Sequence, residues 1–344
     1  GSGGNVIPAT IFYEHLSNEK NVIITTDKRG LKYLDKANYV FEIINTPKLN
    51  NIFFLPLNLI IILFLIIKSF FLLKNKKIDK LISTGGYMSL PPILAAKILN
   101  LEIYLFEPNQ ILGRSNRYFL RLCKKIICYT DNVKNFPTRY KNKIEVIDCL
   151  VRKKFYEIQS FKKDNKRFNL TILGGSQGAS VFDKDLKEII FEISKKNYIK
   201  IFQQTSKTNI MDLKDYYSKK NIENTIFNFD ENLINHLYQS DLCITRAGAS
   251  VLAELSVLNI PFIAVPLPSA KDNHQFENAN FYKQKNCCWI IDQSYLKDEL
   301  EKILSDIMKN NTDLIKKKEN LKKLNYQNTW INVNQKLLSI INEN

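Results

Sequence analysis

The chain has 344 residues, of which 45% are hydrophobic and 24% charged, so two globular domains with hydrophobic cores are expected. Its formal net charge of +16 favours an anionic partner: nucleic acid, an anionic membrane surface or a phosphorylated substrate. The lysines are scattered and form no stripe with exposed aromatic residues, which argues against nucleic-acid binding. Solvated surface lysines are an equally good account of part of the charge.

The six cysteines form no CxxC pair and no metal-like group with the three histidines. Their neighbours are apolar, as in IICYT and DLCIT, so we expect buried, reduced thiols. No metal site is predicted. Because no signal peptide opens the sequence, we expect a cytoplasmic location.

In chain order, short apolar runs alternate with amphipathic stretches, a pattern typical of βαβ units and parallel sheets. In the first half, the pattern predicts strands at 21–26, 80–86, 102–107 and 125–130, and helices at 91–100 and 116–125. In the second half, it predicts strands at 168–176, 200–205, 241–248, 261–267 and 287–291, and a helix at 249–259. The fold class is therefore α/β, with two Rossmann-like domains whose parallel sheets face an interdomain cleft.

A polar, basic stretch at 149–167 predicts the domain boundary. The expected parts are a first domain at 1–148, a second at 149–327, and a final helix at 328–344. The opening GSGGNVIPAT (1–10) is either a cloning linker or a phosphate-type turn. Matching turns later in the chain favour the turn, and we then expect the strand that would precede it to be absent from this sequence.

The most apolar segment is 51–77, NIFFLPLNLIIILFLIIKSFFLLKNKK. Pro56 and Asn58 interrupt it and Lys68 follows, which makes it borderline for a membrane span. It could be a buried helix, a helix with one face in lipid, or a true span. We favour a lipid-resting helix over 52–73 with its lysines near anionic headgroups, because a span here would break the βαβ order.

Four glycine-containing turns lie at 1–10, 83–92, 173–180 and 245–254, each at the start of a predicted helix. Glycine lets the backbone approach a ligand closely, and a helix N-terminus offers free N–H groups to phosphate. Their number predicts a diphosphate-bearing substrate in the cleft. None has the GK[ST] of a Walker loop or the complete GxGxxG of a dinucleotide site, so no cofactor is predicted.

The segments GSGGNVIPA, TGGYMS, EPNQILGRSNR, LGGSQGA, TRAGASVLAEL and KDNHQFENA occur in this order from residue 1 to about residue 290. In these segments the chain resembles the MurG-type bacterial peptidoglycan glycosyltransferases of glycosyltransferase family 28. The resemblance implies the GT-B architecture, with the final helix returning to the first domain. It also implies an inverting transfer of N-acetylglucosamine (GlcNAc) from UDP-GlcNAc to the muramyl 4-hydroxyl of a polyprenyl-pyrophosphate-linked muramyl peptide, without a metal.

The same resemblance implies a role in peptidoglycan synthesis and a peripheral location at the cytoplasmic face of the inner cell membrane. An anionic membrane surface and other cell-wall enzymes are then the expected macromolecular partners, and nucleic acid is not. Two alternatives stay open. One is a related GT-B enzyme that glycosylates another membrane lipid, such as diacylglycerol, and the other is an inactive relative.

By resemblance, the donor site lies in the second domain. The matched residues are Arg152, Ser176, Gln177, Phe229, Ala249, Ser250, Val251, Glu254, His274 and Gln275. Phe229 is expected to cap the uracil, Glu254 to bind the ribose diol, and His274 to read the sugar together with its neighbour. Taken alone, these would be a core aromatic, an exposed helix carboxylate and a surface histidine, and Arg152 would be part of a basic linker.

The matched acceptor residues are Ser2, Gly3, Gly4, Asn5, Gly85, Gly86, Tyr87, Ser89 and Asn109. Here the chain departs from the family, which has a histidine at the position of Asn5 and a His and a Gln on either side of Glu107. An amide cannot accept a proton at neutral pH, so Glu107 becomes the candidate catalytic base. His15 is not expected to substitute, since it lies ten residues into the first helix.

Overall fold

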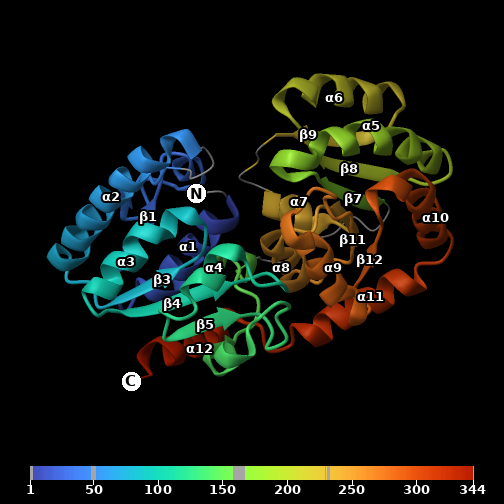
Figure 1. The fold of residues 1–344 in the computed structure, drawn as a ribbon. Coiled ribbons are helices and arrows are strands. Elements are labelled where there is room, and N and C mark those ends of the chain that lie inside the picture. Colours follow the sequence, from blue (N-terminus) through green and yellow to red (C-terminus); the bar gives the residue numbers. More distant parts are fainter. Residues whose placement is uncertain (1–2, 48–51, 158–166, 229, 231–232, 344) are drawn as a thin grey trace. The chain divides into compact units, whose positions relative to one another are not determined.

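The structure is a computed structural model that describes residues 3–47, 52–157, 167–228, 230 and 233–343, apart from the side chains of residues 52 and 176–179. The chain divides into two compact units, which we describe separately (Figure 1). Unit 1 comprises residues 1–153 and 328–344, and unit 2 comprises residues 154–327. Residues 149–153, expected at the start of the second domain, therefore belong to unit 1.

Unit 1 contains a four-stranded parallel sheet in the order β3-β4-β5-β6 and a separate parallel pair, β1-β2. Its strands are β1 (Ile24–Thr26), β2 (Phe41–Ile43), β3 (Lys80–Ser83), β4 (Glu102–Glu107), β5 (Lys125–Cys128) and β6 (Ile144–Val146). Its helices are α1 (Gly3–Leu16), α2 (Leu55–Asn75), α3 (Leu90–Ile98), α4 (Arg114–Phe119) and α12 (Trp330–Asn342).

Alternation along β4 builds two hydrophobic cores on opposite faces of the four-stranded sheet. Ile103 and Leu105 pack in a cluster with residues of α3 and α4. Tyr104 and Phe106 pack in a second cluster with residues of α1 and α12. Successive strand residues point to opposite faces, so one apolar run serves both cores. The C-terminal helix is thus an integral part of unit 1.

Helix α2 exposes most of its apolar surface. It packs beside α3, and its buried residues include Ile62, Leu65 and Leu73 (Figure 1). Only 22% of its most apolar 18-residue stretch is buried. Phe64 is 65% exposed and Ile60 is also 65% exposed. By length and composition α2 is able to cross a membrane. Its exposure does not fit a buried core helix, one of the three alternatives above.

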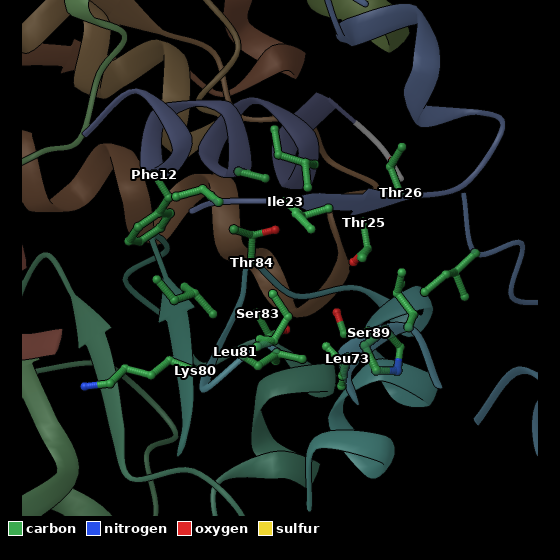
Figure 2. Close-up of a pocket in the computed structure, with 18 of the residues that line it drawn as sticks. Phe12, Ile23, Thr25, Thr26, Leu73, Lys80, Leu81, Ser83, Thr84 and Ser89 are labelled. Carbon is green, nitrogen blue, oxygen red and sulfur yellow. The ribbon is translucent and has the colours of Figure 1, made fainter. Parts of the chain in front are cut away.

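A cavity of about 210 Å³ separates the two sheets of unit 1 (Figure 2). It is lined by consecutive residues from Lys20 to Thr26, a stretch that ends with β1, and from Ile78 to Gly85, a stretch that contains β3. β1 pairs only with β2, and β3 only with β4, among the described residues. Both strands turn an unpaired edge to the cavity, which therefore has the position that a strand between them would occupy.

Unit 2 contains one six-stranded parallel sheet in the order β12-β11-β10-β7-β8-β9. Its strands are β7 (Phe168–Leu173), β8 (Ile199–Gln204), β9 (Glu223–Phe227), β10 (Leu242–Thr245), β11 (Phe262–Ala264) and β12 (Cys288–Ile290). Its helices are α5 (Gly175–Ser194), α6 (Ile210–Lys219), α7 (Leu233–Gln239), α8 (Ala249–Val257), α9 (His274–Gln284), α10 (Leu296–Lys309) and α11 (Thr312–Leu324). The chain order reverses between β10 and β7, the topological switch point of an open parallel sheet.

Several predicted elements differ from the structure for identifiable reasons. The strand predicted at 80–86 ends at Ser83, because Gly85 and Gly86 adopt φ values of 89° and 85°. The helix predicted at 116–125 spans only Arg114–Phe119. β2, β6 and β9 were not predicted, since they are short and carry Glu, Asn or Thr among few apolar residues. Five of the six cysteines are buried, Cys149 is half-buried, and none forms a disulfide.

His15 joins α1 to α12 inside the core of unit 1. Its ring stacks on Trp330 with a centroid distance of 3.6 Å, and its Nδ1 lies 3.1 Å from Asn334 Oδ1. The neutral ring therefore donates from Nδ1, and Nε2 is buried with no hydrogen-bond partner among the described residues. Burial lowers the pKa of His15 to about 4, against an opposing contribution from the bond to Asn334.

We expect this histidine to make unit 1 sensitive to acid. The folded-state pKa of His15 lies below the ordinary value. The stabilisation of the folded state by the buried, neutral ring is therefore complete above pH 6.5 and is lost as the pH falls toward 4. The free energy of unfolding should decline by up to about 3 kcal/mol over that range. The measurement is urea unfolding of wild type and His15→Phe, which retains a ring on Trp330. The two pH profiles should diverge below pH 6.5, and parallel profiles would contradict the assignment.

Candidate active site

The predicted acceptor turn brings Asn5 and the paired glycines together in unit 1. A Cβ atom on Gly86 would lie 2.5 Å from Asn5 Nδ2, at the end of the Asn5 side chain, and the φ of 85° at Gly86 would strain any other residue. Thr84 Oγ1 donates a 2.8 Å hydrogen bond to the backbone oxygen of Asn5, which joins the turn to the first turn of α1. Gly3 and Gly4 form the start of that helix, and Ser2 lies outside the described residues.

Further contacts hold the glycine turn from α3 and α4. Ser89 Oγ donates to the Gly85 oxygen at 2.9 Å, and Ser115 Oγ donates to the Gly86 oxygen at 3.0 Å. Tyr87 is 39% exposed, and the Arg29 guanidinium lies 5.1 Å from its ring centroid. The Asn5 amide, the Tyr87 phenol and the Arg29 guanidinium, which is paired with Asp27, therefore lie at or beside the turn, and such groups suit a hydroxyl-rich, anionic ligand.

Glu107 is buried behind this turn, with 2% of its surface exposed. Its Oε1 accepts from Asn109 N and Nδ2 at 3.2 and 2.9 Å. Its Oε2 accepts from Gly113 N at 2.7 Å and Asn116 Nδ2 at 3.0 Å. Burial raises the pKa of the Glu107 carboxyl, and the hydrogen bonds from Asn109, Gly113 and Asn116 oppose that rise. The carboxylate thus fastens the loop after β4 to the start of α4.

This geometry bears on the predicted catalytic base. A base must come within hydrogen-bond reach of the hydroxyl that it deprotonates, and the buried Glu107 carboxylate is occupied by four donors. The side-chain amide nitrogen of Asn109 likewise donates its hydrogen bond to Glu107. The base assignment stays a prediction, whereas the hydrogen bonds themselves give Glu107 a positioning role.

In unit 2, two loops meet where the strand order reverses. β7 leads through Gly174 into α5, and β10 leads through Arg246, Ala247 and Gly248 into α8. Two helix N-termini therefore lie at neighbouring strand ends, which suits an anionic ligand. Ser176 and Gln177 fall in the first turn of α5 but their side chains lie outside the described part, as does all of Phe229.

The residues predicted against the diphosphate and ribose lie on α8. Ala249, Ser250 and Val251 form its first turn and are half-buried. Glu254, one turn further, is 7% exposed. This burial rules out the alternative of an ordinary exposed helix carboxylate. Arg152 is half-buried in unit 1, whereas the other predicted donor residues belong to unit 2.

The loop before α9 fixes both predicted sugar-reading side chains. Gln275 Oε1 accepts from Ala247 N at 3.2 Å and Leu267 N at 2.9 Å. Two donors on the oxygen fix the amide orientation, and Nε2 has no partner in the described part of the chain, so it is available to a ligand hydroxyl. His274 Nδ1 lies 2.8 Å from the Lys271 oxygen, an acceptor, which places the ring proton on Nδ1 and leaves Nε2 as an acceptor.

The comparisons with known proteins identify the family of the chain. The N-terminal and C-terminal domain models of glycosyltransferase family 28 match residues 1–128 and 169–329. A UDP-N-acetylglucosamine–N-acetylmuramyl-(pentapeptide) pyrophosphoryl-undecaprenol N-acetylglucosamine transferase from Pelagibacter ubique is 49% identical, over all of this chain and 97% of the relative. The Rickettsia bellii enzyme of the same name is 35% identical over 87% of this chain and 86% of its own.

The chain belongs to glycosyltransferase family 28.

Solved structures support the family 28 fold. The crystal structure of Acinetobacter baumannii MurG matches with a TM-score of 0.76 and 24% identity, over 99% of this chain and 96% of that one. A UDP-GlcNAc 2-epimerase from Neisseria meningitidis, bound to UDP-GlcNAc, matches with a TM-score of 0.67 and 14% identity, over 100% and 98%. At these identities the likeness concerns the fold, and it confirms the predicted GT-B class.

Two residues of this family 28 site were missed in the sequence. Asn116 Nδ2 donates to the Phe106 oxygen and to Glu107, but the motif containing it gave no sign that its amide points inward. In the sequence, Arg246 is only part of a predicted glycine turn and has no predicted role of its own, but in the structure its side chain is buried. Among the described residues no group of three or more His, Cys, Asp or Glu side chains is arranged to hold a metal.

Glu107→Gln separates the positioning role from the catalytic one. The new amide nitrogen would face a hydrogen-bond donor, and we expect the free energy of unfolding to fall by about 1–3 kcal/mol. Urea unfolding measures this loss, with the exposed Glu19→Gln as the matched control. A variant that keeps its full stability but loses turnover would instead favour a base.

Proposed function

We propose that this chain transfers GlcNAc, with inversion, from UDP-GlcNAc to the muramyl 4-hydroxyl of a polyprenyl-pyrophosphate-linked muramyl peptide. The proposal is carried by one observation above all: 49% identity, across the whole chain, to a relative whose name gives the donor, the lipid-linked muramyl peptide and the transfer of N-acetylglucosamine. The helix N-termini at the switch point of unit 2 are consistent with a sugar nucleotide as donor.

In the proposed donor site, the diphosphate lies against the first turns of α5 and α8, near Ser176 and Ser250. Glu254 accepts hydrogen bonds from the ribose diol, and Gln275 donates from its oriented Nε2 to a sugar hydroxyl. The contacts of Phe229 with uracil and of Arg152 with the nucleotide remain predictions from the sequence. The helix N-termini stabilise the negative charge of departing UDP.

In the proposed acceptor site, the glycine turn and α1 present backbone N–H groups and Asn5 to the pyrophosphate and muramyl group, with Tyr87 beside them. In a single displacement, the bond from the muramyl oxygen to the anomeric carbon forms as the bond to UDP breaks. UDP departs with the bonding electrons, and the hydroxyl proton passes to a base, a role for which Glu107 remains the prediction. Glu107 keeps Asn109 in place for this step.

The reaction is tested with radiolabelled UDP-GlcNAc and the lipid-linked muramyl peptide. We expect labelled lipid and an equal amount of UDP. Loss of the carboxylate in Glu254→Gln should raise KM for UDP-GlcNAc about tenfold or more, since a hydrogen bond to a charged group is removed. Glu301→Gln, an exposed exchange on α10, is the control.

Other outcomes of that assay would overturn the proposal. Label on diacylglycerol in place of the muramyl lipid would identify the related lipid glycosyltransferase. Absence of both UDP and labelled lipid would identify an inactive relative.

We further propose that α2 holds the enzyme peripherally on an anionic membrane surface, at the cytoplasmic face where the lipid-linked acceptor lies. Its exposed apolar side chains are followed by Lys74, Lys76 and Lys77, all exposed. Apolar burial and attraction of lysine to anionic headgroups act together on such a helix. Other cell-wall enzymes stay predicted partners.

Vesicle co-sedimentation tests this surface. The chain should bind vesicles of anionic phospholipid at low salt, and binding should weaken as salt is added. Replacing Ile60 and Phe64 together by Asp should reduce binding at least tenfold, because two exposed apolar contacts are lost. Ile331→Asp, at a 65% exposed position on α12, is the control. Equal binding by all three proteins would refute the assignment to α2.

A further inference from the structure

Arg246 is a buried cation at the switch point of unit 2. It is 7% exposed and directly follows β10. Its backbone N–H donates to the Leu173 oxygen, at the end of β7, and two residues later Gly248 caps α8. The backbone of Arg246 thus lies between the two strands whose loops open α5 and α8.

The guanidinium is held by neutral groups. Nη1 donates to the Val265 oxygen at 3.1 Å and Nη2 donates to Gln293 Oε1 at 2.7 Å. The ring of Phe182 lies 4.7 Å from the guanidinium carbon. In the described part of the chain, no carboxylate forms an ion pair with Arg246, and its Nε has no hydrogen-bond partner.

The nearby acidic side chains have other partners. Asp183, next to Phe182 on α5, accepts from Gln203, Thr205 and Asn209. Asp292, next to Gln293, is exposed and accepts from Ser294. Burial lowers the pKa of Arg246, but a guanidinium remains protonated in proteins. A full positive charge is therefore kept in the sheet, and no carboxylate of the described residues is paired with it.

Such a charge is unfavourable for folding, and an apolar side chain of similar shape would fill the same space without it. Its field, however, extends to the loops above it, because the guanidinium is buried and no carboxylate of the described residues is paired with it. Phe182 lies seven residues after the start of α5, which corresponds to about 10 Å along the helix axis. The charge is therefore within reach of an anion at the two helix N-termini.

We propose that Arg246 is a positioning residue whose fixed charge favours the departing nucleoside diphosphate over the intact sugar nucleotide. This inference rests on the proposed function. When the bond between the anomeric carbon and UDP breaks, its electron pair stays on the phosphate oxygen, and the nucleotide gains one negative charge. Arg246 stabilises that additional charge without touching it, whereas its hydrogen bonds hold the loops in place.

Gln293→Glu tests the charge without disturbing the shape. It keeps the hydrogen bond to Nη2 and places an anion against the guanidinium, which cancels the outward field. At about 10 Å and an effective dielectric constant of about 20, one unit of charge corresponds to roughly tenfold in affinity. We therefore expect UDP to lose roughly tenfold more affinity than UDP-GlcNAc, and kcat to fall roughly tenfold.

Uridine, which carries no phosphate, should bind Gln293→Glu as it binds wild type. Gln284→Glu, at an exposed position on α9, adds the same net charge elsewhere and is the matched control. Arg246→Lys, which retains the charge but loses the fork of hydrogen bonds, should keep the preference for UDP over UDP-GlcNAc. Calorimetric titration gives the affinities, and the transfer assay gives kcat.

An equal loss of affinity for uridine, UDP and UDP-GlcNAc would mean that Arg246 only supports the loops, and would overturn the inference. So would an unchanged ratio of UDP to UDP-GlcNAc affinity. Both results leave the proposed function intact, provided that wild type transfers GlcNAc. A wild-type chain that neither binds UDP-GlcNAc nor transfers sugar would refute the proposed function itself.

Discussion

Both candidate sites depend on one constraint: parallel strands of a sheet end at the same edge. Each strand there passes the chain through a short loop into a helix, whose free N–H groups then point outward. In unit 1 this geometry places the Gly85–Gly86 turn beside the start of α1, and in unit 2 it places the starts of α5 and α8 at adjoining strand ends. The glycines are favoured there because Gly85 and Gly86 adopt φ values of 89° and 85°, which strain any residue with a Cβ atom. The proposed phosphate sites therefore depend first on backbone topology and only then on side chains.

The two buried charges show opposite electrostatic solutions. Glu107 is surrounded by four donors, so its charge is satisfied locally and little of its field reaches a ligand. Arg246 has two neutral acceptors and an aromatic ring, so much of its field is uncompensated. A satisfied buried charge organises the chain around it, whereas an unsatisfied one acts at a distance. This contrast is the reason for assigning loop anchoring to the first residue and stabilisation of a leaving group to the second.

The architecture was predictable because β3, β7 and β10 each lead into a glycine turn, and because β4 and β5 are largely apolar runs. The strands β2, β6 and β9 could not be predicted from the sequence, because their few residues are stabilised by neighbouring strands that lie elsewhere in the chain. For the site, the motifs identified Asn5 and Gln275, but not the inward direction of the Asn116 amide, which two acceptors distant from it in sequence determine. Likewise, the burial of Glu107 follows from packing that no local pattern records. Residue type and spacing specify loops, whereas burial and hydrogen-bond partners require the tertiary structure.

The α2 segment shows why composition alone left three alternatives. Length and hydropathy are the same whether a helix is buried, rests on lipid or crosses it. In the structure, Ile62, Leu65, Ser69 and Leu73 share the side that packs inward, at spacings of three and four residues. The opposite side, including Ile60 and Phe64, is apolar but exposed. Exposing apolar surface to water costs a free energy of about 25 cal/mol per Å². Since one side of α2 already packs in unit 1, a lipid surface can cover the opposite side while that packing is kept. A spanning helix surrounded by lipid would lose it.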